Sequence, residues 1–316
     1  MMSNMKVRFT SISRLFFRFC AGLRTLILAI MFSPAILSPA SASEPEQSAV
    51  LELGVAPFLP ARTLVQNYQP MRAYLEQHLK QPVLFVMAPD YKTFYERTQR
   101  REYPVIITVA NAAYLAYAES GYVPMLRPVI DTRPVLVVPK NSNLTRMQNL
   151  RGKTVALPDP LAIIAMQGVQ MLRETGLNPG NDITLRHLPD HSTAVNHVIA
   201  GETAAAIVSD RALLQMPAAT QEGVRVIQAW EKGAAPGVVY LANPALPPQR
   251  VAQLTQAILK FVRETPEGRE FIMKLGYGGL VPATKQDLEP LASYGELLKE
   301  KVVRSNEKEK IRVSSE

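Results

Sequence analysis

Residues 105–121 read VIITVANAAYLAYAESG and contain a complete strand-to-helix unit. The run 105–109 is apolar on both faces, which is typical of a strand buried inside a parallel sheet. The alanine-rich run 112–120 favours a helix, and Gly121 is a suitable residue to cap its C-terminal end. A buried strand followed directly by a helix indicates an α/β fold.

The same alternation continues on both sides of this unit. The pattern of apolar residues predicts further strands at 50–55, 82–87, 122–130, 134–138, 150–157, 183–188, 204–208, 224–228 and 237–242. Helices are expected at 64–79, 91–101, 162–175, 192–200, 247–264, 267–275 and 288–301. The helix at 91–101 is polar and expected to be exposed, and the charged tail 305–316 is expected to be flexible.

Two short segments that contain Pro or Gly, 131–134 and 231–236, divide these elements into two groups. We expect the chain to cross between two lobes there, so that 43–132 and 237–304 form one lobe and 133–236 the other. Ligands of open α/β sheets bind beyond the carboxyl ends of the strands. Two lobes that face each other at those ends can close on a small solute.

Residues 1–42 have the three parts of a secretory signal peptide. Five basic and no acidic residues occur up to Arg24, an uncharged and mostly apolar run covers 25–37, and Ala40, Ser41 and Ala42 form a small-residue cleavage site. The apolar run is shorter than the roughly 20 residues of a spanning helix. We therefore expect cleavage and export to the periplasm, with an uncleaved membrane anchor as the alternative.

The net charge of +8 belongs mostly to this leader. Removing its five basic residues from the 35 in the chain leaves 30 against 27 acidic residues, a net charge of +3. No basic cluster remains, so we expect no nucleic-acid partner. Cys20 is the only cysteine and also lies in the leader, after Phe17, Arg18 and Phe19, which do not suit a lipidation site. The mature chain then has no disulfide, thiolate metal site or cysteine nucleophile.

Short motifs in a fixed order point to one protein family. They are YQPMRAYL at 68–75, APDY at 88–91, LRGKTVA at 150–156, Asp159-Pro160, and His191 ahead of Ala194, Val195 and Gly201. With these motifs the chain resembles the periplasmic phosphate-, phosphite- and phosphonate-binding proteins of ABC transporters, in the type-II periplasmic-binding-protein superfamily. The resemblance covers roughly residues 50–300. It implies a two-lobed α/β fold with two interdomain crossovers and a small, anionic ligand.

Residues 161–168, LAIIAMQG, depart from the family pattern. After Asp-Pro the family has Ser and Thr hydroxyls that hold the phosphonate, and this segment has none. Each charge-assisted hydrogen bond lost in this way is worth roughly 1.5–3 kcal/mol. The family's acidic residue after the following glycine is Ala204 here. The fold and the binding role therefore carry over, whereas the ligand itself stays open.

Seven residues are candidates for the ligand site: Phe58, Tyr91, Asn111, Arg133, Asp159, His191 and Ser192. The resemblance places the residues that match Tyr91 and His191 in the family's cleft, and Asn111 where its ligand loop follows the third strand. An amide both donates and accepts hydrogen bonds, and Arg133 lies in the first crossover, within reach of either lobe.

Each candidate also has a purely structural alternative. Asn111 would cap a helix that begins at Ala112, and Asp190 or Ser192 would cap the next lobe's helix and leave His191 exposed. For the remaining candidates the alternatives are a packing turn at Phe58, a surface position for Tyr91, a surface salt bridge for Arg133 and a helix cap at Asp159.

The chain has no Gly-x-Ser-x-Gly elbow, P-loop or His-Glu-x-x-His motif, so we expect no enzymatic activity. His187, His191 and His197 are close in sequence, but the last two fall on different faces of a helix, and we expect no metal and no cofactor. We expect a monomeric periplasmic solute-binding protein that presents a small anion to an ABC permease in the inner membrane. The alternative is a ligand-sensing module that signals to a membrane receptor.

Overall fold

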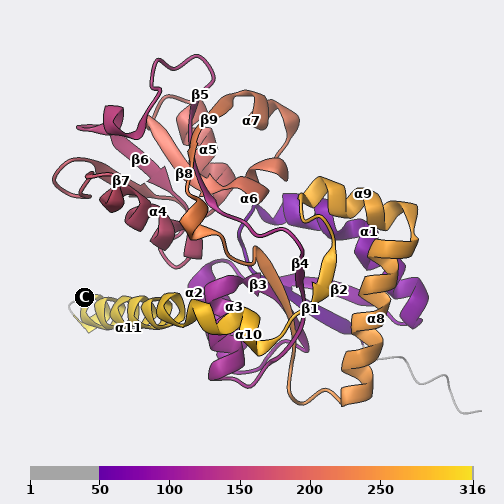
Figure 1. Cartoon of the computed structure of the whole chain (residues 1–316). Coiled ribbons are helices and arrows are strands. Elements are labelled where there is room, and N and C mark those ends of the chain that lie inside the picture. The colour runs from indigo at the N-terminus through magenta and orange to yellow at the C-terminus, as the bar shows by residue number, and fades with distance from the viewer. Residues whose placement is uncertain (1–49, 315–316) are drawn as a thin grey trace, which may run out of the picture. The chain divides into compact units, whose positions relative to one another are not determined.

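The computed structural model describes residues 50–314, which contain two β-sheets (Figure 1). The first sheet has the strand order β11-β4-β10-β3-β1-β2. Its strands are β1 (Leu51–Val55), β2 (Val83–Met87), β3 (Val105–Val109), β4 (Val123–Pro128), β10 (Val238–Ala242) and β11 (Leu280–Pro282). Strands β2, β1 and β3 are parallel, while β10 runs antiparallel to both β3 and β4.

The second sheet is built from the middle of the chain, in the order β7-β6-β8-β5-β9. Its strands are β5 (Pro134–Pro139), β6 (Thr154–Leu157), β7 (Thr184–His187), β8 (Ala205–Ser209) and β9 (Val224–Ala229). Strands β7, β6 and β8 are parallel, and β5 is antiparallel to its two neighbours. Each sheet therefore combines parallel strands with an antiparallel strand that enters from the crossover region.

Helices follow most of the strands. They are α1 (Ala61–Leu79), α2 (Tyr91–Gln99), α3 (Ala110–Ala118), α4 (Ile163–Glu174), α5 (His191–Ile199), α6 (Asp210–Leu214), α7 (Ala218–Glu222), α8 (Pro248–Glu264), α9 (Pro266–Leu275), α10 (Lys285–Leu288) and α11 (Ala292–Ser314). Three short 3-10 turns cover Met147–Leu150, Glu231–Gly233 and Glu289–Leu291. No helix within residues 50–314 is both long enough and apolar enough to cross a membrane.

The two segments that link the sheets are bonded to each other. The backbone N–H of Thr132 donates to the carbonyl of Ala235 at 2.8 Å, and the N–H of Ala235 donates to the carbonyl of Thr132 at 3.0 Å. The chain thus leaves the first sheet and comes back to it along a pair of adjacent backbones. Crossovers at 131–134 and 231–236 were predicted from the same residues.

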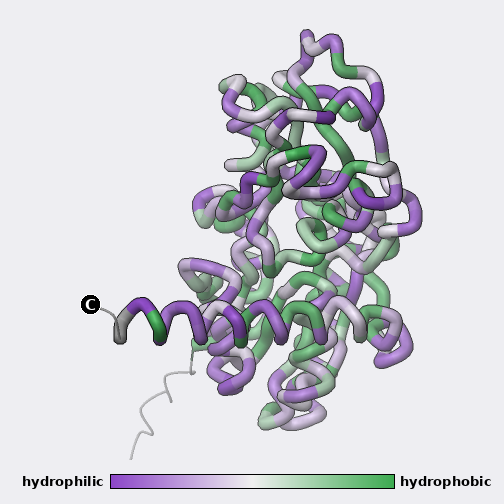
Figure 2. Tube along the Cα trace, turned by 90° about the vertical axis from the view of Figure 1, so that its left-hand side faces the viewer, coloured by the Kyte–Doolittle hydropathy of each residue, from purple (hydrophilic) through white to green (hydrophobic). Residues whose placement is uncertain are grey.

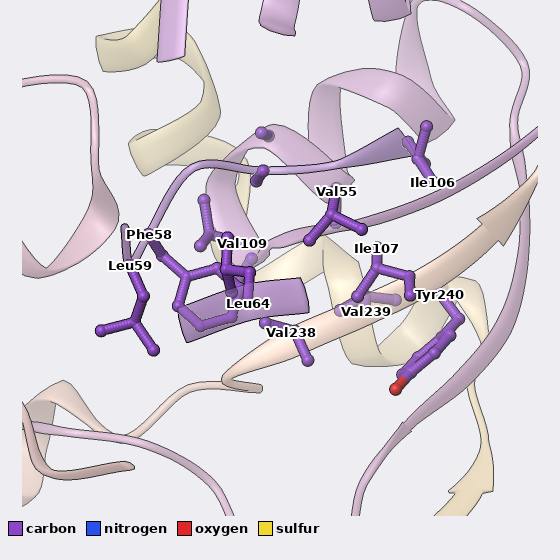
Figure 3. Close-up of a cluster of buried hydrophobic side chains, with 14 of the residues drawn as sticks. Val55, Phe58, Leu59, Leu64, Ile106, Ile107, Val109, Val238, Val239 and Tyr240 are labelled. Atoms are coloured by element: carbon purple, nitrogen blue, oxygen red, sulfur yellow. The ribbon is translucent and has the colours of Figure 1, made fainter. Parts of the chain in front are cut away.

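One hydrophobic core cluster includes residues from both sheets. Figure 3 shows its part around β1, β3 and β10, where Val55, Ile107 and Val239 lie close together. The same cluster contains Leu161 and Val208 from the second sheet's half of the chain. Burial of apolar area is the dominant stabilising term in folding, so part of that stabilisation comes from apolar side chains that both halves of the chain contribute.

Helices α2 and α5 begin in the same way after their strands. The carboxylate of Asp90 accepts the backbone N–H of Thr93 at 2.7 Å, and that of Asp190 accepts the N–H of Thr193 at 2.9 Å. Such N-caps satisfy donors that a helix leaves unpaired at its start. The cap places the next residue, Tyr91 or His191, at the first position of each helix.

Three sequence-based expectations were wrong. The helix after β3 begins at Ala110 rather than Ala112. Helix α2 is not simply exposed, because it buries Tyr91, Phe94, Tyr95 and Thr98. The residues from 305 onward, expected to be flexible, continue helix α11 as far as Ser314, which Figure 2 shows as a mostly hydrophilic helix with hydrophobic positions at intervals.

Candidate functional site

A small cavity, called here the central cavity, lies between residues of the two sheets. Its apolar lining consists of Phe58, Val109, Ile163, Ile164, Ala212 and Val238. Its polar lining consists of Thr132, His191, Ser209, Arg211, Gln215 and Tyr277, with Gly237 beside them. The cavity volume is about 30 Å³, close to the volume that one water molecule occupies in the liquid.

The strand ends explain why these residues meet. Val109 is the last residue of β3, and Val238, the first of β10, pairs directly with it. Phe58 follows the end of β1, and Ser209 is the last residue of β8. The central cavity therefore lies at the carboxyl ends of strands in both sheets, which is where α/β sheets bind ligands.

His191 presents a neutral imidazole to the central cavity. The backbone N–H of Ser209 points to its Nδ1 at 3.4 Å, so this nitrogen is the acceptor and Nε2 carries the proton. Burial lowers the pKa of His191 to about 3, because a charged imidazolium would lose its hydration. Its backbone N–H also contacts the carbonyl of Phe58 at 3.4 Å. The ring is thus a fixed, uncharged donor.

Arg211 supplies a positive charge to the cavity. Arg211 belongs to helix α6, whose start is fixed by an N-cap. The hydroxyl of Ser209 accepts the backbone N–H of Ala212 at 3.1 Å. Arg211 Nη2 lies 3.5 Å from Asp210 Oδ2. Its Nε is buried, and among the described residues it has no hydrogen-bond partner.

Gly276 makes room for that arginine. It ends α9 with a φ of +69°, a conformation that favours glycine. A Cβ at this position would lie 2.8 Å from Leu214 Cδ1 and 3.2 Å from Arg211 Cδ. Helix α6 of one half of the chain and helix α9 of the other therefore approach each other closely at Gly276.

Gln215 and Tyr277 form the polar end of the cavity. Gln215 Nε2 donates to the Tyr277 hydroxyl at 3.4 Å and to the Leu275 carbonyl at 3.5 Å, and its backbone carbonyl accepts from Asn67 Nδ2 at 3.4 Å. Its Oε1 is buried without a partner in the described part of the chain. Burial raises the pKa of Tyr277 to about 12, so this phenol stays neutral and able to donate.

Two of the seven residues expected from the sequence, Phe58 and His191, line the central cavity. The structural alternative for His191, an exposed ring behind a capping Asp190, is half right. Asp190 is the cap, but His191 is only 3 % exposed.

Asn111 is fully buried within α3, so its proposed capping role was wrong. Its Nδ2 donates to the Leu161 carbonyl at 2.9 Å and approaches Met166 Sδ at 3.8 Å. Its Oδ1 has no partner among the described residues. The residue ties the first sheet's helix to the segment that leads into α4.

Tyr91 and Asp159 lie outside the lining of the central cavity. Burial, followed by the negative charges of Asp159 and Asp190, raises the pKa of Tyr91 well above its usual range. Burial also raises the pKa of Asp159 to about 6, although the backbone N–H of Leu161 donates to this carboxylate at 2.8 Å. Asp159 thus holds the turn before α4 but does not cap that helix, whose N-cap is Ala162 without a side-chain hydrogen bond.

Arg133 and Ser192 are also absent from the cavity lining. Arg133 Nε pairs with Asp210 at 3.3 Å, and its Nη1 pairs with the exposed Glu231, which corresponds to the salt-bridge alternative. Ser192 is buried, and its hydroxyl has no partner within residues 50–314.

Five polar residues of the cavity lining were not predicted from the sequence, namely Arg211, Gln215, Thr132, Ser209 and Tyr277. Ser209, Asp210 and Arg211 follow directly after the apolar run 204–208, so the rule that ligands bind beyond strand ends was enough to select them. Tyr277 follows a helix rather than a strand, and no local pattern marks it.

Comparison with known families identifies the chain. A family model described as "ABC transporter, phosphonate, periplasmic substrate-binding protein" matches residues 53–288. The chain belongs to this family. This family of periplasmic substrate-binding proteins is the one inferred from the motifs around Tyr68, Asp90 and Gly152, so the resemblance is confirmed.

Solved structures confirm the two-lobed α/β class at low sequence identity. A binding-protein component of an ABC phosphonate transporter from Pseudomonas aeruginosa has a TM-score of 0.67 and 13 % identity, with 84 % of this chain and 99 % of that chain covered. PhnD1 from Prochlorococcus marinus, in complex with methylphosphonate, has a TM-score of 0.68 and 12 % identity over 79 % and 98 %. A Xanthomonas citri protein bound to chloride has a TM-score of 0.61 and 17 % identity over 80 % and 99 %.

Proposed function

We propose that this periplasmic substrate-binding protein holds a small anionic solute in the central cavity and hands it to a permease in the inner membrane. The proposed lobes are 43–132 with 237–304, and 133–236; the structure describes the first of them from residue 50 onward. They close over the solute by bending at the bonded segments around Thr132 and Ala235. The single observation that carries this function is the cationic Arg211 beside the neutral donor His191 in a cavity at the strand ends.

An unsatisfied polar atom supports a binding role. A buried polar group without a partner costs roughly 1–3 kcal/mol, and the Nε–H of Arg211, a residue that lines the cavity, is such a donor among the described residues. An anion that accepts from this N–H recovers the cost. Methylphosphonate in PhnD1 and chloride in the Xanthomonas citri protein are small anions, which supports the same ligand charge here.

The remaining parts of the proposal follow from this role. Residues 1–42, which lie outside the described residues, are proposed to be a cleaved export signal. The protein acts as a monomer, uses no cofactor and releases its ligand chemically unchanged. Recovery of an unaltered ligand after prolonged incubation, measured by NMR, tests the claim that it is not an enzyme.

A sensing role is the second candidate, and the entrance to α4 favours it. Ile163 and Ile164 occupy the first turn of this helix and line the cavity, where members of the family have hydroxyls. A protein that no longer takes the usual transport ligand is free to report on another solute to a membrane receptor. Uptake of the bound solute by cells with and without this chain separates the two roles.

A thermal-shift screen of the purified full chain tests the proposed function. Small anions, amines, sugars and alcohols of similar size are compared, because a ligand that binds only the folded state raises the melting temperature by mass action. We expect anions alone to raise it. A shift with amines or sugars and none with anions would overturn the proposed ligand charge, and no shift with any solute would overturn the binding role.

A further inference from the structure

We infer that the solute is an organic oxyanion with one negative charge and a short apolar group, and that Arg211 is the residue that selects this charge. The inference rests on the proposed function and names its ligand class. Short-chain sulfonates and carboxylates share the required chemistry.

The charged groups around the central cavity favour a ligand with a single negative charge. Among the lining residues, Arg211 is the only one with a formal charge, because His191 stays neutral. Asp210 shares its carboxylate between Arg211 and Arg133, and also accepts from the Thr132 hydroxyl at 2.8 Å. The other partner of Arg133, Glu231, is 71 % exposed, so water screens its charge. The buried groups therefore leave about one positive charge to be balanced.

The donors in the cavity suit a small oxyanion head. Arg211 Nε–H is buried without a partner in residues 50–314, and the ring of His191 carries its proton on Nε2. The hydroxyls of Thr132 and Ser209 lie 2.6 Å apart and bond to each other. The donors for an oxyanion are therefore one cationic N–H, that of Arg211, and the neutral groups of His191 and Tyr277. A dianionic phosphonate needs more charge-assisted bonds to replace its water.

The rest of the lining suits an apolar group. Phe58, Val109, Ile163, Ile164 and Val238 surround the polar end. A hydroxyl-rich or cationic group in contact with these side chains would lose hydrogen bonds to water without replacement. The volume of about 30 Å³ is close to that of one water molecule, so the proposed bending of the lobes must widen the cavity to admit a solute, and the solute must itself be small.

Isothermal titration of the full chain with methanesulfonate, propionate, methylphosphonate and inorganic phosphate tests the inference. We expect the two monoanions to bind, and phosphate not to bind. Methylphosphonate gains its second charge as the pH rises through the neutral range, somewhat above the range of a phosphate monoester, whereas methanesulfonate keeps one charge throughout. Binding of methylphosphonate should therefore weaken relative to methanesulfonate as the pH rises through this range.

Two substitutions separate a recognition role of Arg211 from a general charge effect. Arg211→Gln should weaken monoanion binding by about 10- to 100-fold, which corresponds to the loss of one hydrogen bond to a charged group. Arg186→Gln is the matched control, since it also replaces an arginine by glutamine. Arg186 lies in β7, outside the central cavity, and forms a half-exposed salt bridge with Glu202. This substitution should leave the affinity unchanged. Circular dichroism establishes that both variants are folded.

The outcomes distinguish this inference from the proposed function. Preferred binding of phosphate or of the methylphosphonate dianion, or an unchanged affinity in folded Arg211→Gln, would overturn the ligand class and keep the binding role. The absence of binding by every anion, amine and sugar would overturn the proposed function itself. Preference for sulfonate over carboxylate, or the reverse, identifies the head group within the inferred class.

Discussion

Asn111 Nδ2 lies 2.9 Å from the carbonyl oxygen of Leu161 and joins helix α3 of the first sheet to the segment that enters α4 of the second. The bond is fully buried, and the two residues are 50 positions apart in the chain. A contact of this kind bonds the two halves of the chain directly to each other.

The substitution Asn111→Ala should lower the free energy of unfolding by about 1–3 kcal/mol, because it leaves the Leu161 carbonyl buried without its donor. Urea denaturation measures the effect. Asn196→Ala, at an exposed position in α5, is the control and should stay within about 0.5 kcal/mol of the wild type. Equal effects of the two substitutions would contradict the importance of the buried bond.

Gly276 and Gly176 form a second matched pair, since both have a positive φ, +69° and +77°. Alanine in this conformation costs roughly 1–2 kcal/mol. A Cβ added at Gly176 would have no atom within 4 Å, whereas a Cβ added at Gly276 would meet Leu214 at 2.8 Å. Gly276→Ala should therefore destabilise the protein more than Gly176→Ala in thermal unfolding, and should weaken ligand binding by displacing Arg211. A smaller effect at Gly276 would show that α6 and α9 are not tightly packed.

His191 should make the protein less stable in acid. Its pKa is about 3 in the folded protein against an ordinary value of 6.5. Between these values the unfolded chain binds a proton that the folded imidazole does not, so the free energy of unfolding falls as the pH drops below about 6.5. Denaturant titrations of wild type and His191→Gln across this range test the point. The free energy of unfolding should fall less steeply with decreasing pH in the variant than in the wild type. The same pH dependence in both proteins would exclude a neutral His191.

Ile164 should help to exclude a phosphonate dianion. Ile164→Thr places a hydroxyl donor in the first turn of α4, within the cavity lining. We expect a stability loss of about 1–3 kcal/mol from the buried hydroxyl. We also expect a higher affinity for methylphosphonate relative to methanesulfonate, measured by calorimetry. Val169→Thr, farther along the same helix and outside the central cavity, should not change that ratio.

The sequence predicted the strands better than the site. The apolar run 105–109 has the same bounds as β3, because a strand buried on both faces is visible in its local composition. Strand β11, by contrast, has three residues and is defined by its pairing with β4. Helix α6 has five residues, too few to show a helical period, and so the helix itself was not predicted.

The ordered C-terminal half of helix α11 also could not be predicted from local sequence. This charged half looked too polar to be ordered, yet Lys92 pairs with Glu309 at 2.6 Å and Lys299 pairs with Glu119 at 2.5 Å. These partners lie in α2 and at the end of α3, far away in the chain, so no local pattern contained this information. The burial of His191 depends in the same way on Phe58 and Ser209, which the chain brings to it from either side.

The mutual bonds of Thr132 and Ala235 restrict how the two sheets can move. Two independent tethers would allow twisting, sliding and bending in any combination. Because these two tethers are bonded to each other, we expect them to move together, so that the sheets turn mainly about one axis through the pair. A single angle would then describe the state of the protein, and a partner that docks across both sheets would sense that angle.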